Sequence, residues 1–467
     1  MKNLKRVLCA LLALVMVLGF VGCKNNGDDK TTPAPNNTNK PAESEVPATA
    51  VPTTPLPTGD YNAMSAAIYD AQLGAFNTLY QAAKEETNVS KRYALMAQAE
   101  AKLLEAAVLI PGTTNGGNYG MSRVAKRSAS TVLWGNDSDR FHNVLVTTEL
   151  IAAEDQTHLK AMWNEVRGTG TYTQKATDYL KEKGYTLKDT YNMGYASDPK
   201  TWDALATSRS ADSEAIVNTY DGLVEYDNEN EIKPALAESW EVSEDGKTYT
   251  FHIRPGVLFS DGEKCDAYAI KANFDAILEN KDRHTWLEMM HLLVGVDAPD
   301  ENTFVIELSE PYYPLLTELG VTRPFAMISP KAMKDGSTKD GVEAYIGTGP
   351  YVLDEFVTDE YAIFKANPNY WGEQPAIKTI TVKVIPDNQT RILALEKGEI
   401  DMIFGKNMID ADAINQYLDS DKFTVELSDP TSTRQIVLNT SSDILSEKDV
   451  RIALQHATNK QNISDGI

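Results

Sequence analysis

Apolar side chains recur every three or four residues through much of the chain between residues 60 and 187. This spacing places them on one face of a helix. It predicts helices over Tyr61–Glu86, from Asn88 or Ser90 to Ala107, over Ala152–Arg167 and over Thr173–Lys183. Pro111 and Gly112 stop the second helix, and a short strand is expected among the glycines that follow. We therefore expect a helix-rich segment here.

A different pattern begins at Thr190, where short apolar runs alternate with helical ones. Strands are predicted over Tyr191–Tyr195, Val224–Tyr226, Thr248–Ile253, Thr303–Leu308, Thr379–Ile385 and Ile400–Phe404, and helices over Ser213–Leu223, Ala267–Leu278 and Asn388–Lys397. The strand–helix–strand order between residues 379 and 404 indicates an α/β domain with crossover connections.

The first 22 residues have the pattern of a secretory leader. Lys2, Lys5 and Arg6 precede one apolar run, Val7–Val21, which is too short for a comfortable membrane span. The run ends at Gly22-Cys23 and resembles the lipobox of bacterial lipoproteins, although Phe20 replaces the usual leucine. The resemblance implies cleavage before Cys23 and acylation of its sulfur, which would anchor the protein on the extracytoplasmic face of the cell membrane. A plain signal peptide is the alternative.

Residues 23–59 are expected to form a disordered tether. Pro, Thr, Asn, Ala and Ser dominate this segment, and it has almost no large apolar side chain to offset the entropy cost of ordering. Its prolines keep it extended. The part from Asp60 to Ile467 is long enough for two or three domains.

Charge and cysteine content exclude several classes of partner and crosslink. The net charge is −23, and loss of the three leader cations takes it to −26. Nucleic acid is therefore not expected as a partner, because phosphate binding needs clustered Lys and Arg. Cys9 would leave with the leader and Cys23 would be acylated, so Cys265 has no intrachain partner. We expect Cys265 to be a buried small apolar residue.

Seven motifs follow one another in order from Asn192 onward. They are SDPKTWD at Ser197–Asp203, YDGLV at Tyr220–Val224, PALAESWEV with DGKTYTF between Pro234 and Phe251, RPGVLFSDG at Arg254–Gly262, GTGPY at Gly347–Tyr351, NPNYW at Asn367–Trp371 and GEID at Gly398–Asp401. Together they resemble the extracytoplasmic solute-binding proteins of ABC importers, in the oligopeptide, dipeptide and nickel branch. None of them is an enzyme signature.

This resemblance implies an α/β fold of the periplasmic-binding-protein type II class, a two-lobed clamshell with an extra subdomain. The solute-binding domain would then cover residues 188–467, with the main first lobe at 191–232 and 341–427, the extra subdomain at 233–340 and the start of the second lobe at 428–467. The family continues well beyond this point, so the second lobe is expected to be mostly absent and ligand binding by the chain alone to be weak.

The segment 60–187 carries a second resemblance. Ser90–Pro111, SKRYALMAQAEAKLLEAAVLIP, is similar to the family's last helix and the strand after it, which normally lie near the C-terminus. The alternative is an unrelated helical insertion. We expect residues 90–111 to dock on the first lobe and to bury Tyr93, Met96, Leu103 and Leu104 against it.

The resemblance also assigns the ligand cleft. Its lining would be the loop Ser208-Arg209-Ser210, together with Thr348 of the GTGPY loop, which would bind a peptide main chain. Ordinary loop residues are the alternative. His284 and His291 lie seven apart and suit surface histidines better than a metal site. No cofactor and no metal are expected.

The function expected from these residues is that of a lipid-anchored, monomeric receptor. It would capture oligopeptides outside the membrane and deliver them to ABC permease subunits, without catalysis. The alternatives are another small solute, such as an oligosaccharide or a nickel chelate, and a truncated surface interaction protein that no longer serves transport. A hydrolase is disfavoured because no nucleophile-elbow motif is present.

Overall fold

The computed structural model describes residues 61–115, 119–129, 141–198, 202–205, 218–226, 231–334, 342–404, 408–418, 423–427 and 432–465. The predicted leader, Cys23 and the tether lie outside these residues. Among the helices that are described, none is both long and apolar enough to span a bilayer.

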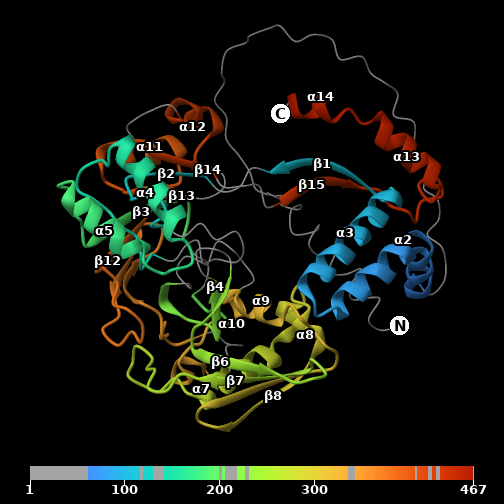
Figure 1. The fold of residues 1–467 in the computed structure, drawn as a ribbon, viewed down its shortest axis with the longest axis horizontal. Helices are drawn as coiled ribbons and strands as arrows, with labels where there is room; N and C mark the ends of the chain where they lie inside the picture. The colour runs from blue at the N-terminus through green and yellow to red at the C-terminus, as the bar shows by residue number, and fades with distance from the viewer. Residues whose placement is uncertain are drawn as a thin grey trace, which may run out of the picture. The chain divides into compact units, whose positions relative to one another are not determined.

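A seven-stranded mixed sheet forms the largest layer (Figure 1). Its strand order is β10-β11-β12-β3-β13-β2-β14. The bounds are β2 Tyr119–Ser122, β3 Thr190–Tyr195, β10 Tyr351–Val357, β11 Tyr361–Ala366, β12 Thr379–Val384, β13 Met402–Phe404 and β14 Thr424–Leu427. Strand β3 pairs in parallel with both β12 and β13, and helix α11 (Asn388–Lys397) connects those two. This is the predicted crossover unit.

A second, antiparallel sheet of four strands has the order β6-β7-β9-β8. Its strands are β6 Ala237–Val242, β7 Thr248–Ile253, β8 Leu293–Asp300 and β9 Thr303–Leu308, and β4 Val224–Tyr226 pairs with β5 Ile232–Pro234 nearby in sequence. Along β7 every second residue is buried, as in a strand with one face on a core. Phe251, Phe274 and Cys265 belong to that core, so the predicted burial of Cys265 is confirmed. We call residues 235–334 the four-stranded subdomain.

Short helices complete this subdomain and the region after the large sheet. They are α7 Ala267–Glu279, η3 Lys281–His284, α8 Met289–Leu292, α9 Leu315–Leu319, α10 Thr322–Phe325, η4 Pro330–Ala332 and α12 Ala411–Tyr417. Asp266 caps α7 by accepting a hydrogen bond from the Ala269 amide at 3.0 Å.

The helices expected between residues 60 and 187 are present. They are α2 Tyr61–Glu85, α3 Val89–Glu105, α4 Ala153–Val166 and α5 Tyr172–Glu182. Of the two caps considered for α3, the structure uses Asn88, whose side chain accepts from the Lys91 amide at 3.1 Å. Helices α4 and α5 share an apolar core with Leu159 and Leu180 at its centre.

Buried Asp155 adds a polar contact to the α4–α5 core. It accepts hydrogen bonds from Tyr179 and Tyr185 at 2.6 and 2.7 Å and pairs with Lys183 at 3.0 Å. Burial alone would raise the pKa of Asp155, but these donors outweigh burial and hold the pKa below its usual range. The carboxylate therefore stays charged and fastens α4 to α5.

The expectation that residues 90–111 dock on the first lobe is not confirmed, because the end of this segment pairs with a strand after residue 432. Strand β1 (Leu109–Asn115) pairs antiparallel with β15 (Ser432–Val437), which leads to α13 (Lys448–Ala457) and α14 (Lys460–Asp465). The fully buried Arg451 of α13 donates two hydrogen bonds to the carbonyl oxygen of Ala106, at 3.3 and 2.8 Å. The early segment is therefore joined to the chain after residue 432.

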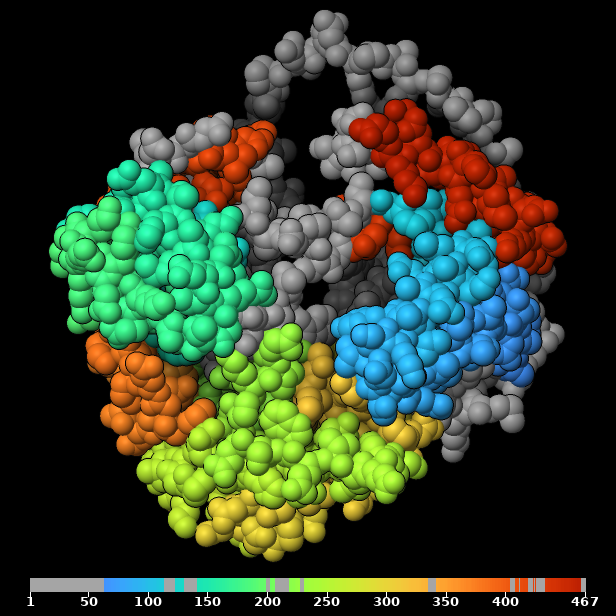
Figure 2. All heavy atoms as spheres, in the orientation of Figure 1, coloured from blue at the N-terminus to red at the C-terminus, as the bar shows by residue number. Residues whose placement is uncertain are grey.

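The predicted burial of the apolar face of α3 is wrong for Tyr93 and Leu104, whereas Met96 and Leu103 are half-buried. Tyr93 is 71% exposed and Leu104 is 41% exposed. Figure 2 shows α3 as light-blue spheres. The helix leads into β1, whose partner is β15 and not a strand of the large sheet.

Candidate functional site

Asp221 of the YDGLV motif lies at the meeting point of three motifs. Its side chain is fully buried, and its Oδ2 accepts hydrogen bonds from Thr348 Oγ1 at 3.0 Å and from Trp371 Nε1 at 2.9 Å. Its carbonyl accepts from the amide of Met327 at 2.9 Å. We call residues 218–223, 347–351 and 367–371 the Asp221 junction. A buried carboxylate with such donors fixes the three segments to one another.

The glycines of the GTGPY loop allow its close approach to residues 218–220. A Cβ on Gly347 would lie 2.1 Å from the carbonyl oxygen of Thr219, and one on Gly349 would lie 2.6 Å from the carbonyl carbon of the same residue. The Gly349 amide donates to that carbonyl at 3.1 Å. Asn367 completes the loop by donating from Nδ2 to the Gly349 carbonyl at 2.9 Å. Only glycine fits at these two positions.

Aromatic rings surround the junction. The Trp202 ring lies 5.2 Å from Tyr345 and 5.4 Å from Phe356, and the Arg254 guanidinium lies 4.7 Å from the Trp371 ring. Tyr220 is fully buried and donates to the Trp202 carbonyl at 3.3 Å, and burial raises the pKa of its phenol. The phenol therefore stays neutral and serves as a donor.

Hydrogen bonds hold the residues on either side of the segment assigned to the ligand cleft. On one side, the Leu205 carbonyl lies 2.6 Å from Nε2 of His284; on the other, Asn218 Oδ1 accepts from the Phe141 amide at 3.1 Å. Ser208, Arg209 and Ser210 themselves lie outside the described residues, so their assignment stays a prediction. Residues 213–217 of the predicted helix Ser213–Leu223 also lie outside them. Of its described residues, Asn218 and Thr219 are helical, and those from Tyr220 onward are not.

Thr348 is the one predicted cleft residue that the structure describes. It is fully buried, and its hydroxyl binds Asp221. The structure thus brings Thr348 together with two residues that sequence reasoning did not select, Asp221 and Trp371. A direct contact between Thr348 and a solute remains a prediction.

The surface assignment of His284 is wrong. Its ring is fully buried, and burial lowers its pKa, so the ring is neutral and the Leu205 carbonyl accepts its Nε2 proton. It ends η3, whereas His291 lies in α8, so the seven-residue spacing does not mark one helical face. Among the described residues, no group of three His, Cys, Asp or Glu side chains is placed to hold a metal ion.

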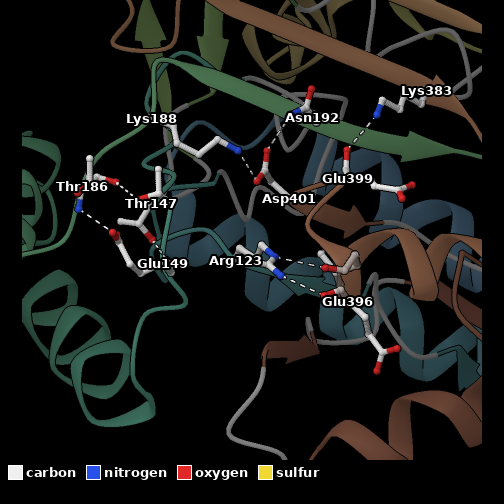
Figure 3. Close-up of polar contacts among 12 residues, drawn as sticks. Arg123, Thr147, Glu149, Thr186, Lys188, Asn192, Lys383, Glu396, Glu399 and Asp401 are labelled. Carbon is white, nitrogen blue, oxygen red and sulfur yellow. Dashed lines mark hydrogen bonds and ion pairs between the residues drawn. The ribbon is translucent and has the colours of Figure 1, made fainter.

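A second polar cluster surrounds Asp401 of the GEID motif (Figure 3). Its carboxylate lies 2.7 Å from Lys188 Nζ and accepts from the Asn192 amide at 2.9 Å, and its side chain is only 2% exposed. Its carbonyl accepts from the Arg123 amide at 2.8 Å, and Arg123 also donates to the Leu395 carbonyl. This cluster binds the segment before residue 190 to β3 and α11.

The comparison with known families identifies the chain. A sequence profile described as "Bacterial extracellular solute-binding proteins, family 5 Middle" matches residues 231–467, which is just over half of the chain. The chain belongs to this family. The predicted family and the predicted α/β, type II periplasmic-binding-protein fold are confirmed. As a family 5 solute-binding protein, the chain is extracytoplasmic.

Individual relatives cover only part of this solute-binding protein. The nickel-binding periplasmic protein of Escherichia coli K12 is 43% identical over 247 residues, 53% of this chain and 47% of the relative. The dipeptide-binding protein of the same organism is 32% identical over 284 residues, 56% and 52% respectively. Among solved structures, NikA from Brucella suis in complex with Fe(III)-EDTA is 41% identical and covers 49% of this chain and 46% of that one, with a TM-score of 0.47. The chain spans about half the length of the curated relatives it matches.

Proposed function

We propose that this protein is the oligopeptide receptor of an ABC importer, anchored by lipid to the outer face of the cell membrane. The observation that carries the proposal is the family match over residues 231–467, which includes the subdomain and the GTGPY, NPNYW and GEID motifs. Relatives named for dipeptide, D,D-dipeptide and glutathione binding support a peptide ligand. Ligand capture and delivery to permease subunits require no chemical step, so we propose a binding protein and not an enzyme.

A nickel chelate is the second candidate, because one observation favours it. The nickel-binding relative is 43% identical to this chain, against 32% for the dipeptide-binding one. A chelated ion brings its own ligands, so the protein need supply only shape and a few polar contacts.

The proposed cleft is tested by solute binding. In thermal-shift and NMR titrations, we expect millimolar di- to pentapeptides to bind and nickel–histidine chelate to bind less or not at all. Replacing Ser208 and Ser210 together with alanine should weaken binding by about tenfold, about 1.4 kcal/mol, because their hydroxyls are proposed to contact the peptide main chain. The exposed Ser441→Ala is the matched control. Binding of the chelate alone would replace the peptide assignment, and binding unaltered by the double substitution would move the site elsewhere.

The anchor has its own test. The variant Cys23→Ser is expected to leave the precursor uncleaved or to release the protein from the membrane fraction, since an acyl chain contributes about 0.8 kcal/mol for each buried methylene and cannot be attached to serine in this way. Cell fractionation and mass spectrometry of the mature N-terminus measure this. The control is Cys9→Ser, within the leader. Unchanged fractionation together with an unacylated N-terminus would contradict the anchor.

A further inference from the structure

The helix pair α2–α3 lies outside the apolar cores of the protein. Within α3 only Ala99 is fully buried, and Val89 and Tyr93 are 46% and 71% exposed. None of the four apolar clusters formed by the described residues contains a residue of α2 or α3. In α2, Tyr69 and Ala83 are buried, but they too lie outside those clusters, so the pair does not share a large apolar core with the rest of the described chain.

An ion pair joins the end of α2 to the four-stranded subdomain. Lys84 Nζ lies 3.2 Å from Oε1 of Glu288, the residue that precedes α8. The two side chains are 15% and 23% exposed. This is more buried than a typical surface pair, so the pair is less screened by salt.

Arg92 makes a second contact with the same subdomain. Its guanidinium carbon lies 3.1 Å from the centre of the Tyr313 ring. The same side chain donates to the carbonyls of Glu86 and Thr87 at 2.9 and 3.3 Å, in the connection between α2 and α3. Arg92 therefore stiffens the turn of the helix pair while its flat face rests on the subdomain.

Hydrogen bonds within the subdomain hold the backbone at Glu288. The partly buried carboxylate of Glu318 accepts hydrogen bonds from the amides of Glu288 and Met289 at 3.1 and 2.9 Å and from the Tyr312 hydroxyl at 2.7 Å. These bonds fix the backbone that presents Glu288 to Lys84. Such preorganisation lowers the entropy cost of making the contact.

We propose that Lys84–Glu288 and Arg92–Tyr313 form a latch that reversibly fastens the helix pair α2–α3 to the four-stranded subdomain. Partly exposed polar contacts of this kind are weak enough to open and reclose, unlike a shared apolar core. Because α3 runs directly into β1, which pairs with β15, release of the latch would free both helices together with that strand pair. In a solute receptor the latch would tune how readily the clamp opens, and this consequence rests on the proposed function.

Hydrogen–deuterium exchange of the full chain without ligand tests the latch. Lys84→Glu and Glu288→Lys, each alone, should make the amides of α3 and of residues 285–292 exchange about threefold faster or more, as loss of one ion pair predicts. The charge swap carrying both substitutions should restore slow exchange. Lys91→Glu, at an exposed position of α3, has the same charge change and should leave exchange as it was.

Two results would overturn the latch. One is a single charge reversal that leaves the exchange rates unaltered, and the other is a double variant with a rate increase equal to the two single increases combined. Should a reversal prevent folding, Lys84→Gln and Glu288→Gln replace it, and their double variant should exchange no faster than either single. No solute is present in these measurements. If the exchange rates change as expected but neither peptides nor chelates bind, only the proposed function is refuted and the latch stands.

Discussion

The substitution Gly349→Ala is expected to lower the free energy of unfolding by roughly 3 kcal/mol. The added Cβ would lie 2.6 Å from the carbonyl carbon of Thr219, 2.7 Å from the Tyr220 nitrogen and 2.8 Å from the Asn218 oxygen. All three are backbone atoms, so no rotamer change relieves the clash. The loop must move away, and the hydrogen bonds of Thr348 and Asn367 weaken with it.

Urea unfolding followed by tryptophan fluorescence measures this loss, and Trp371 of the junction is a local reporter. The matched control is Gly295→Ala in β8, where an added Cβ meets no atom within 4 Å. That control should change stability by no more than about 0.5 kcal/mol. Equal midpoints for the two variants would show that the junction is not closely packed in solution.

Replacing Asp401 with asparagine is expected to cost about 2–4 kcal/mol of stability. The carboxylate is 2% exposed and pairs with Lys188, whose side chain is 19% exposed. Removing the carboxylate charge leaves the partly buried Lys188 ammonium without its partner. The amide also loses part of the hydrogen bonding to the Asn192 backbone.

Loss of local structure should concentrate around β3 and the segment before it. Exchange of the amides of residues 185–195 should therefore accelerate more in Asp401→Asn than global unfolding explains. Glu399→Gln, two residues away with a side chain 56% exposed, is the control and should be nearly neutral. If both variants have the same urea unfolding midpoint, the Asp401 cluster contributes nothing measurable to stability.

Local patterns predicted many single elements to the residue. Strands β7 and β9 and helix α11 have the predicted bounds. The alternation of apolar and polar residues in a strand and the capping of a helix both depend on residues close together in sequence. Helix α11, for example, begins after Asp387, which accepts from the Thr390 amide, and ends at Gly398 with a φ of +76°.

Long-range partners were not predictable in the same way. The pairing of β1 with β15 and the burial of His284 depend on residues far away in sequence. The local spacing of apolar residues carries no information about such partners. Asp221 and Asp401 carried a weak signal, since each is an acidic residue next to an apolar one in a motif. The motifs themselves could not show that Thr348 and Trp371 share the Asp221 carboxylate.

The place of β2 in the large sheet has a consequence for how this protein acquires its structure. Ser122 pairs with both Met402 and Thr424, so a strand from the first third of the chain occupies the interior of a sheet completed by the last third. During synthesis β2 has no partner in this sheet until residues 402–427 have emerged. Such a high contact order slows folding and leaves strand edges open to other chains for longer. The biosynthesis of this protein is therefore expected to depend more on chaperones than that of a relative whose sheet grows in sequence order.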